Sequence, residues 1–379
     1  MRHRRSDASG GNDSPMIPID PQVTQLGRYP VRRGESTVSG LSSGAFMAVQ
    51  LHVAHSASFG GAGVIAGGPF RCAETFRPPG TLAGDAQVQN ALYICMSPLV
   101  PAAGPDAAML WELARDAEAR RDIDPLGNLQ DDRVYVFSGT RDRVVAPSVV
   151  EQTAAFYRRA GVAPGALAHV ADVPAGHAII AMNPEDPPLD ANQPPYINRG
   201  DFIQAHTILR HLYPGLAPPS PRLTGTLSRF DQTEFLCDAG DPPATRELDR
   251  RRSSMSPFGY LYVPRSVAEG RPARVHVVLH GCKQGYNYVD FVNGRPDTLN
   301  SPPYGLRYIA CTGYLEIADA NDLILLFPQA QGLDDGYQNP DGCWDWWGYT
   351  SVDPAQPDYY KRSAVQIRAI HRMLERLGG

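Results

Sequence analysis

The chain has 379 residues and a formal net charge of −5, and its basic and acidic side chains are mixed along its length. This balance argues against nucleic acid or an anionic membrane as the main partner. No apolar window approaches the ~18 residues needed to span a bilayer, whereas the hydrophobic content of 42% is enough for a sizeable core.

The N-terminal residues are basic and then rich in Gly, Ser and Asp, without the apolar core of a signal peptide. We expect residues 1–30 to be a disordered lead-in. Residues 31–379 are expected to form a single catalytic domain.

From residue 35 onward, candidate strands alternate with candidate helices. The first half contains strands at 35–39, 63–66, 133–138 and 167–173 and helices at 45–56, 106–121, 147–159 and 201–213. The second half contains strands at 260–263, 274–279 and 323–327 and helices at 304–319 and 363–377. Two segments rich in proline and polar residues, 183–200 and 214–257, are expected to be irregular. The alternation predicts an α/β fold, with a mostly parallel sheet covered by helices on both faces.

The chain contains six cysteines: Cys72, Cys95, Cys237, Cys282, Cys311 and Cys343. Sequence alone allows fifteen complete pairings. An even number of cysteines fits an oxidising compartment, so we expect a secreted or periplasmic protein. Six buried thiols in a cytosolic enzyme are the alternative. Cys72 and Cys95 flank a polar loop and are the first candidate pair, and a disulfide at Cys282 would rigidify its loop.

The pattern Gly40-Leu41-Ser42-Ser43-Gly44 lies between a β-prone stretch and a candidate helix. In a nucleophile elbow, a serine sits on a strained strand-to-helix turn, where glycines remove side chains that would clash. The backbone N–H of the next residue, here Ser43, then points toward the developing oxyanion. The pattern predicts Ser42 as a nucleophile, and a glycine-rich loop without chemistry is the alternative.

A serine nucleophile needs a base and an orienting carboxylate, and both follow predicted strands. Asp142 lies just past the strand at 133–138, and His177 follows the strand at 167–173. The order Ser42, Asp142, His177 is the chain order of α/β-hydrolases. A helix cap is the alternative role for Asp142. We predict these three residues as the catalytic triad.

His280 and Gly281 follow the apolar strand at 274–279. In α/β-hydrolases, a His-Gly segment after an early strand supplies the second oxyanion N–H. That segment normally precedes the nucleophile, but here it comes long after Ser42. We therefore expect a circularly permuted α/β-hydrolase with the join of the old termini within 214–257. His280 as the general base is the alternative.

Several short motifs occur together in the chain. They are Gly-Leu-Ser-Ser-Gly-Ala-Phe-Met at 40–47, Ala-Gly-His at 175–177, His-Gly-Cys-Lys-Gln at 280–284, Thr-Gly-Tyr at 312–314, Ala-Asp at 318–319, Phe-Pro-Gln-Ala at 327–330 and Gly-Cys-Trp-Asp-Trp-Trp-Gly at 342–348. In combination they resemble the extracellular polyhydroxybutyrate (PHB) depolymerases, specifically the circularly permuted, single-domain type known from a fungal enzyme. The resemblance spans roughly residues 35–379.

The resemblance implies a triad of Ser42, Asp142 and His177, with the amides of Ser43 and Cys282 as the oxyanion hole. The chain departs from many family members because it lacks a recognisable secretion signal. It also lacks the polymer-binding domain and Thr-rich linker that many bacterial members carry.

Trp344, Trp346 and Trp347 lie between two glycines in a loop-like segment. Partly exposed indoles present a flat apolar surface with N–H donors, which suits an aliphatic polyester. The resemblance likewise implies that a tryptophan of this cluster lines the ester-binding crevice. We predict these three residues, together with His280, as substrate-binding residues. The alternative is that at least one of the tryptophans packs in the core.

The sequence therefore predicts a serine esterase that hydrolyses poly(3-hydroxybutyrate) or its oligomers through an acyl-enzyme. No metal and no organic cofactor is expected, and we expect a monomer whose partner is the polyester or oligoester substrate. A feruloyl- or acetyl-type carbohydrate esterase is the alternative within the hydrolases. An inactive polymer-binding scaffold is the alternative outside them.

Overall fold

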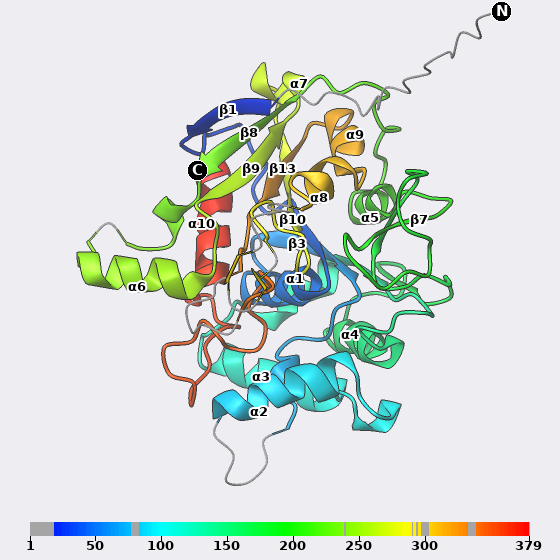
Figure 1. The fold of residues 1–379 in the computed structure, drawn as a ribbon, viewed down its shortest axis with the longest axis vertical. Coiled ribbons are helices and arrows are strands. Elements are labelled where there is room, and N and C mark those ends of the chain that lie inside the picture. Colours follow the sequence, from blue (N-terminus) through cyan, green and yellow to red (C-terminus); the bar gives the residue numbers. More distant parts are fainter. Residues whose placement is uncertain are drawn as a thin grey trace, which may run out of the picture.

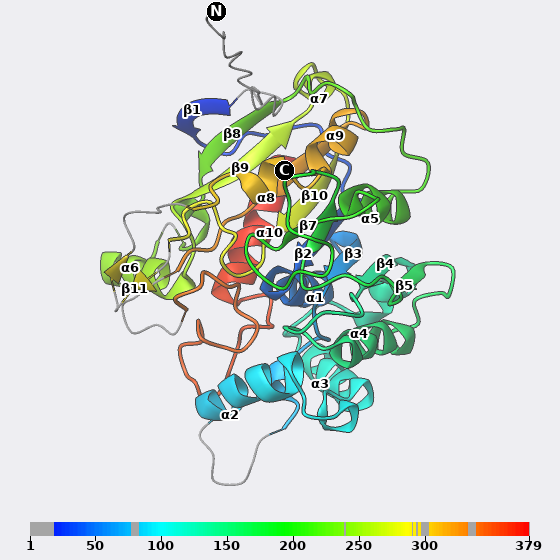
Figure 2. The same cartoon turned by 45° about the vertical axis from the view of Figure 1, so that its right-hand side comes forward.

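The computed structural model describes residues 19–76, 83–238, 240–289, 291–292, 295–296, 303–332 and 339–378. Within these ranges, nine strands form one sheet in the order β1-β8-β9-β13-β10-β2-β3-β4-β5. Figure 2 shows the sheet running from β1 and β8 at the upper left to β4 and β5 at the right. The strands of this sheet are β1 (Ile19–Thr24), β2 (Ser36–Leu41), β3 (Phe59–Ile65), β4 (Arg133–Phe137), β5 (Leu167–Val170), β8 (Thr226–Asp231), β9 (Phe258–Val263), β10 (Arg274–Leu279) and β13 (Leu323–Phe327). Two further pairs are β6 (Ile179–Ala181) with β7 (Ile197–Arg199), and β11 (Phe291–Val292) with β12 (Arg295–Pro296).

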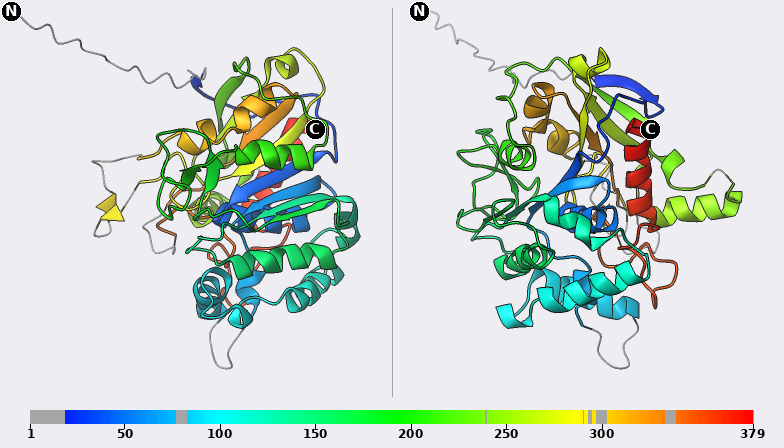
Figure 3. Two further views of the ribbon diagram at one scale, coloured as in Figure 1. Left: turned by 90° about the vertical axis from the view of Figure 1, so that its right-hand side faces the viewer. Right: turned by 180° about the vertical axis from the view of Figure 1, so that it is seen from behind.

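The helices cover both faces of this sheet (Figures 1 and 3). The α-helices are α1 (Ser43–Ala54), α2 (Ala83–Asn90), α3 (Ala107–Ala119), α4 (Pro147–Arg159), α5 (Gln204–Leu212), α6 (Pro243–Ser253), α7 (Arg265–Ala268), α8 (Arg307–Ala310), α9 (Tyr314–Asp319) and α10 (Val365–Gly378). A π-helix spans Ala91–Met96, and short 3-10 helices span Cys72–Glu74, Pro101–Ala103, Leu126–Asp131 and Thr233–Phe235.

The sheet is mostly parallel, since only β9 runs against its two neighbours, β8 and β13. On one face α1 packs on β2, β3 and β10 and touches α10, and α3 packs on α4. The imidazole of His52 on α1 forms a hydrogen bond of 2.9 Å with the hydroxyl of Tyr157 on α4, so these helices lie side by side. On the other face α5 packs on β3 and β4 and touches α9. The α/β fold with helices on both faces is confirmed.

The core is centred on β2, β10 and β13, whose positions are nearly all buried. Parallel strands covered on both faces carry apolar runs, and β10 and β13 do so. Two of the buried hydroxyls of β2 form hydrogen bonds with one imidazole on β10. His276 Nδ1 lies 2.6 Å from Thr37 Oγ1, and its Nε2 lies 2.8 Å from Ser39 Oγ. Each buried polar group of this cluster therefore has a partner.

Strand β2 occupies the middle of the sheet, between β10 and β3. The strands that follow it directly, β3, β4 and β5, extend the sheet on one side. On the other side, β8, β9, β10 and β13 come from residue 226 onward, whereas the edge strand β1 precedes β2 in sequence. This is the order that a circular permutation of an α/β-hydrolase produces, and the permutation itself stays a prediction.

Several predicted segments differ from the structure. The expectation of a lead-in without structure is wrong for residues 19–24, because β1 pairs with β8. The segment 214–257 is not irregular throughout, since it contains β8 and α6. The segment 183–200 contains β7. The single helix expected over 304–319 is two short helices, α8 and α9, separated at Gly313, whose φ of +87° interrupts a helix.

All six cysteines lie in the described ranges. Cys72 pairs with Cys95, as predicted, and Cys282 pairs with Cys343. Cys237 and Cys311 are free thiols. Of the helices in the described ranges, none is long and apolar enough to cross a bilayer.

Candidate active site

Ser42 lies at the turn between β2 and α1, in a backbone conformation that L-residues rarely adopt. Its φ is +55° and its ψ is −122°. This conformation is strained, so contacts with the surrounding structure must stabilise it. The two flanking glycines are required by close approach. A Cβ on Gly40 would lie 2.3 Å from the carbonyl of Gly44, and a Cβ on Gly44 would lie 2.4 Å from the carbonyl oxygens of His280 and Leu279. The elbow therefore packs directly against the loop that follows β10.

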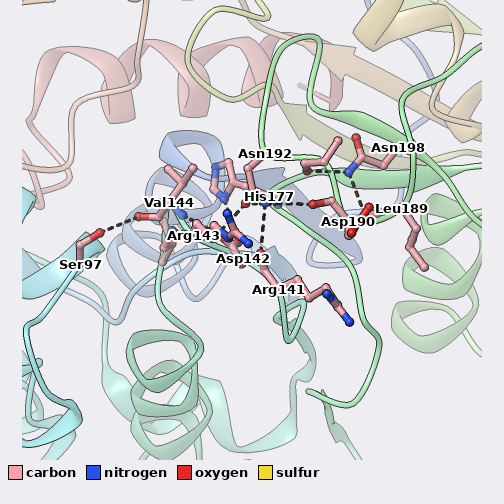
Figure 4. A network of polar contacts seen from close by, with 12 residues as sticks. Ser97, Arg141, Asp142, Arg143, Val144, His177, Leu189, Asp190, Asn192 and Asn198 are labelled. Atoms are coloured by element: carbon pink, nitrogen blue, oxygen red, sulfur yellow. Dashed lines mark hydrogen bonds and ion pairs between the residues drawn. The ribbon is translucent and has the colours of Figure 1, made fainter.

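His177 and Asp142 meet beyond the carboxyl ends of β4 and β5 (Figure 4). His177 Nδ1 lies 2.8 Å from Asp142 Oδ2, and both side chains are almost fully buried. The other carboxylate oxygen, Oδ1, accepts the backbone N–H groups of Val144 at 2.8 Å and Val145 at 2.9 Å. Because these contacts fix Asp142, the imidazole is held through Nδ1 and its Nε2 is left to act as a base.

Asn192 joins the loop of the acid to the loop of the base. Its Oδ1 accepts the N–H groups of Arg143 at 2.9 Å and His177 at 3.0 Å, and its Nδ2 donates to the carbonyls of Arg141 at 3.1 Å and Asp190 at 3.0 Å (Figure 4). All four hydrogen-bonding positions of the amide are thereby used. Sequence reasoning missed this residue, which lies in the proline-rich segment 183–200 and belongs to no motif.

The loop Gly281–Gln284 lines the same cavity as Ser42 and His177. A Cβ on Gly281 would lie 2.9 Å from Gln284 Oε1 and 3.2 Å from the carbonyl oxygen of Leu41, so a side chain here would require the loop or the elbow to shift. The disulfide from Cys282 to Cys343 fixes the loop on one side. On the other side, Gln284 accepts the N–H of Gly281 at 2.7 Å and donates to the carbonyl of Pro195 at 2.6 Å.

These elements enclose a cavity of about 350 Å³. Ser42, Ser43, His177 and Cys282 line it together. The remaining wall is mainly apolar and comes from α1, α2, the π-helix and the loops around Val144 and Trp346. A mainly apolar cavity with a few converging polar groups suits an uncharged organic substrate.

The three predicted tryptophans occupy different places. Trp346 and Trp347 line the cavity, and the ring of Trp346 stacks on Phe46 with centroids 3.9 Å apart. Trp344 is fully buried and donates its Nε1–H to the carbonyl of His280 at 3.0 Å. The expectation that Trp344 binds substrate is therefore replaced by a packing role, because its indole is covered on all sides.

His280 likewise lies outside the cavity lining, with a side chain that is 1% exposed. Both ring nitrogens are bonded to the backbone, at Gly281 and Ala330. This burial excludes a substrate contact and the alternative role of general base toward Ser42. Burial lowers the pKa of His280 to about 4, so the ring is neutral near pH 7.

Asp345 shapes the segment that carries the tryptophans. Its buried carboxylate accepts the N–H groups of Trp347, Gly348, Tyr349 and Thr350 and the hydroxyl of Thr350. Burial raises the pKa of this carboxyl. The contacts fold the segment into a tight turn that presents Trp346 and Trp347 to the cavity. In the described part of the chain, no three His, Cys, Asp or Glu side chains are grouped to hold a metal.

The site lies at the carboxyl ends of strands in a mostly parallel sheet. It combines a serine on a strained turn, a buried His–Asp pair and a glycine loop, a combination typical of the α/β-hydrolases. No protein-family model matches the chain. The chain is 31% identical over 367 residues to the polyhydroxybutyrate depolymerase of Talaromyces funiculosus, covering 92% of this chain and 93% of that relative. The chain belongs to the polyhydroxybutyrate depolymerase family.

Other relatives agree with this assignment. The chain is 35% identical over 361 residues to the poly(3-hydroxybutyrate) depolymerase of Delftia acidovorans, which covers 94% of this chain; the chain spans 62% of that relative's length. Two solved structures match with a TM-score of 0.72 and 27% identity, covering 94% of this chain and 99% of theirs. One is a PHB depolymerase from Penicillium funiculosum, and the other is a serine-to-alanine variant of a PHB depolymerase complexed with an R3HB trimer.

Proposed function

We propose that the protein is a serine esterase that hydrolyses poly(3-hydroxybutyrate) or its oligomers. The observation that carries the proposal is one mainly apolar cavity lined by both Ser42 and His177, with His177 bonded to Asp142 at 2.8 Å. The wall beside Ser42 is formed by the glycine loop that contains Cys282. Membership of the PHB depolymerase family supports the choice of substrate.

In the proposed mechanism, Ser42 Oγ attacks the ester carbonyl while His177 Nε2 takes the serine proton. The carbonyl oxygen becomes an oxyanion that accepts hydrogen bonds from the amides of Ser43 and Cys282. The ester C–O bond then breaks, and His177 returns the proton to the departing alkoxide. Water repeats the sequence on the acyl-enzyme and releases the acid. Asp142 stabilises the imidazolium in both halves of the reaction.

The surroundings of the cavity suit an aliphatic polyester. Leu92 lines the cavity and is 47% exposed, and Tyr93, Leu99 and Val100 on the same stretch are also exposed. Apolar side chains of this kind favour contact with an apolar chain or surface. The two disulfides support secretion or export to the periplasm, because disulfides persist in oxidising compartments.

The test compares the wild-type protein with the Ser42→Ala variant on a PHB suspension, on a trimer of (R)-3-hydroxybutyrate and on methyl ferulate and acetylated xylan. The expected result is clearing of the suspension or cleavage of the trimer by the wild type, and a loss of more than about 10³-fold in the variant. Unchanged thermal melting of Ser42→Ala shows that the fold is intact.

Each alternative has its own outcome in this assay. Release of ferulate or acetate without cleavage of the trimer would favour a carbohydrate esterase. A wild type that binds PHB, hydrolyses nothing and is not labelled at Ser42 by a fluorophosphonate would favour a binding scaffold. Full activity in Ser42→Ala would refute the mechanism.

A further inference from the structure

The buried imidazole of His280 connects two backbone groups on opposite sides of its ring. Its Nε2 lies 3.1 Å from the nitrogen of Ala330, and its Nδ1 lies 2.7 Å from the carbonyl oxygen of Gly281. A backbone N–H can only donate, so Nε2 must accept from Ala330. The ring proton therefore sits on Nδ1, where it is donated to Gly281. The two contacts select one tautomer of a neutral ring.

His280 binds the carbonyl of Gly281. The same peptide unit carries the N–H of Cys282. A trans peptide is planar, with its C=O and N–H pointing in opposite directions. Holding the Gly281 oxygen therefore also fixes the direction of the Cys282 N–H. A hydrogen bond to the carbonyl in addition polarises the same peptide and strengthens its N–H as a donor.

The ring and the preceding peptide are themselves held firmly. The His280 ring packs against Trp344, with centroids 5.4 Å apart, and a Cβ on Gly285 would lie 3.2 Å from Nε2. The carbonyl of His280 accepts from Trp344 Nε1 at 3.0 Å, and the N–H of the same peptide, on Gly281, donates to Gln284. The imidazole thus has little freedom to release the Gly281 carbonyl.

We propose that His280 is a positioning residue. In its Nδ1–H tautomer, the imidazole donates to the Gly281 carbonyl and thereby aims the Cys282 N–H at the oxyanion. The proposal rests on the proposed function, because it assigns the Cys282 amide to the oxyanion hole. His280 does not touch the substrate. It acts through one peptide unit, and the interaction it prepares is stronger in the transition state, where the carbonyl oxygen carries negative charge, than in the ground state.

Two substitutions separate the two contacts of the ring. In His280→Asn, the side-chain N–H₂ is close to the place of Nδ1 and can still donate to Gly281, while the contact with Ala330 is lost. In His280→Gln, the amide reaches the place of Nε2 and can accept from Ala330, while the donor to Gly281 is lost. Both variants remove the imidazole, so loss of packing is common to the two.

The experiment measures kcat and KM of the wild type, His280→Asn, His280→Gln and Ser42→Ala on p-nitrophenyl butyrate, with thermal melting as the control for folding. We expect His280→Gln to lose about 10–100-fold in kcat with KM within about twofold, because up to 10²–10³-fold is lost when an oxyanion donor is removed completely. His280→Asn is expected to retain kcat within about threefold. Equal losses in the two variants, or an effect on KM alone, would overturn the proposal.

A second measurement needs no variant to be active. The ¹⁵N chemical shifts of histidine-labelled wild-type protein report which nitrogen of His280 carries the proton, with the signal assigned by its disappearance in His280→Asn. Protonation at Nδ1 is expected, and a proton on Nε2 would overturn the proposal. A wild type without Ser42-dependent ester hydrolysis overturns the proposed function and, with it, this role. Equal losses in the two variants of an active enzyme overturn this role alone.

Discussion

Removing the disulfide between Cys282 and Cys343 is expected to affect both stability and turnover. The perturbation is the double variant Cys282→Ser with Cys343→Ser, which keeps the backbone amide at 282. The matched control is Cys72→Ser with Cys95→Ser, since both pairs are disulfides of the same chain. The bonds differ in what they restrain: one holds the loop beside Ser42, and the other holds the π-helix that forms part of the cavity wall.

The stability losses can be compared from the lengths of chain that the two bonds close. With separations of 61 and 23 residues, the chain-entropy model gives about 4 kcal/mol for the first disulfide and about 3 kcal/mol for the second. The two double variants should therefore be destabilised to a similar extent. A general loss of stability cannot produce a large difference in kcat between them when both are assayed folded.

The activity losses should differ in kind. Without its disulfide, the loop at 282 loses one anchor of the proposed oxyanion donor, and we expect kcat to fall about tenfold or more, as part of the 10²–10³-fold that such a donor contributes. The control removes support from the apolar wall, so we expect its main effect on KM. The kcat and KM of both double variants are measured on p-nitrophenyl butyrate, at a temperature at which guanidinium unfolding curves show that each variant is folded without denaturant. Equal losses of kcat in the two double variants would refute the reasoning.

Two further expectations concern groups that the proposed chemistry does not use directly. Asn192→Ala removes the clamp between the loops of the acid and the base, and we expect kcat to fall about tenfold with little change in KM, since misplacement of catalytic groups lowers the rate of the chemical step. Wild-type kcat in this variant would contradict the clamp. Burial lowers the pKa of His276 to about 3, so between about pH 6.5 and pH 3 the unfolded chain binds a proton that the folded protein excludes. Stability should therefore decrease as pH falls through this window, by at most about 1.4 kcal/mol per unit for this group. Urea midpoints at pH 7.5, 5.5 and 4.5 measure the effect, and a midpoint that does not change would contradict it.

Much of the sheet could be predicted from the sequence because strands such as β10 and β13 are largely apolar runs that alternate with candidate helices. The bounds of β13 and α4 agree with the prediction at both ends. Ser42, Asp142 and His177 could also be singled out as candidates, since each follows a strand in the chain order of the α/β-hydrolases. Local patterns carry this information.

The misses are elements whose partners are distant in sequence. Strand β8, with the sequence TLSRFD, has no continuous apolar run, and it is defined by pairing with β1 and β9. Helix α6 is rich in charge and buries only Asp249 and Ser253, so no apolar periodicity marks it. Asn192 and His280 act through backbone groups of other segments. Only the folded chain shows which carbonyl or N–H lies within reach of them.

The position of β2 in the sheet also determines when the active site can form during synthesis. Its neighbour on one side, β3, emerges from the ribosome soon after it, but its neighbour on the other side is β10, and Thr37 pairs with His276 across 239 residues of chain. Until β10 is made, β2 has an unpaired parallel edge, which favours association with other chains. Such long-range pairing also slows folding. The half-sheet that carries the nucleophile therefore needs protection from association with other chains until β10 is made.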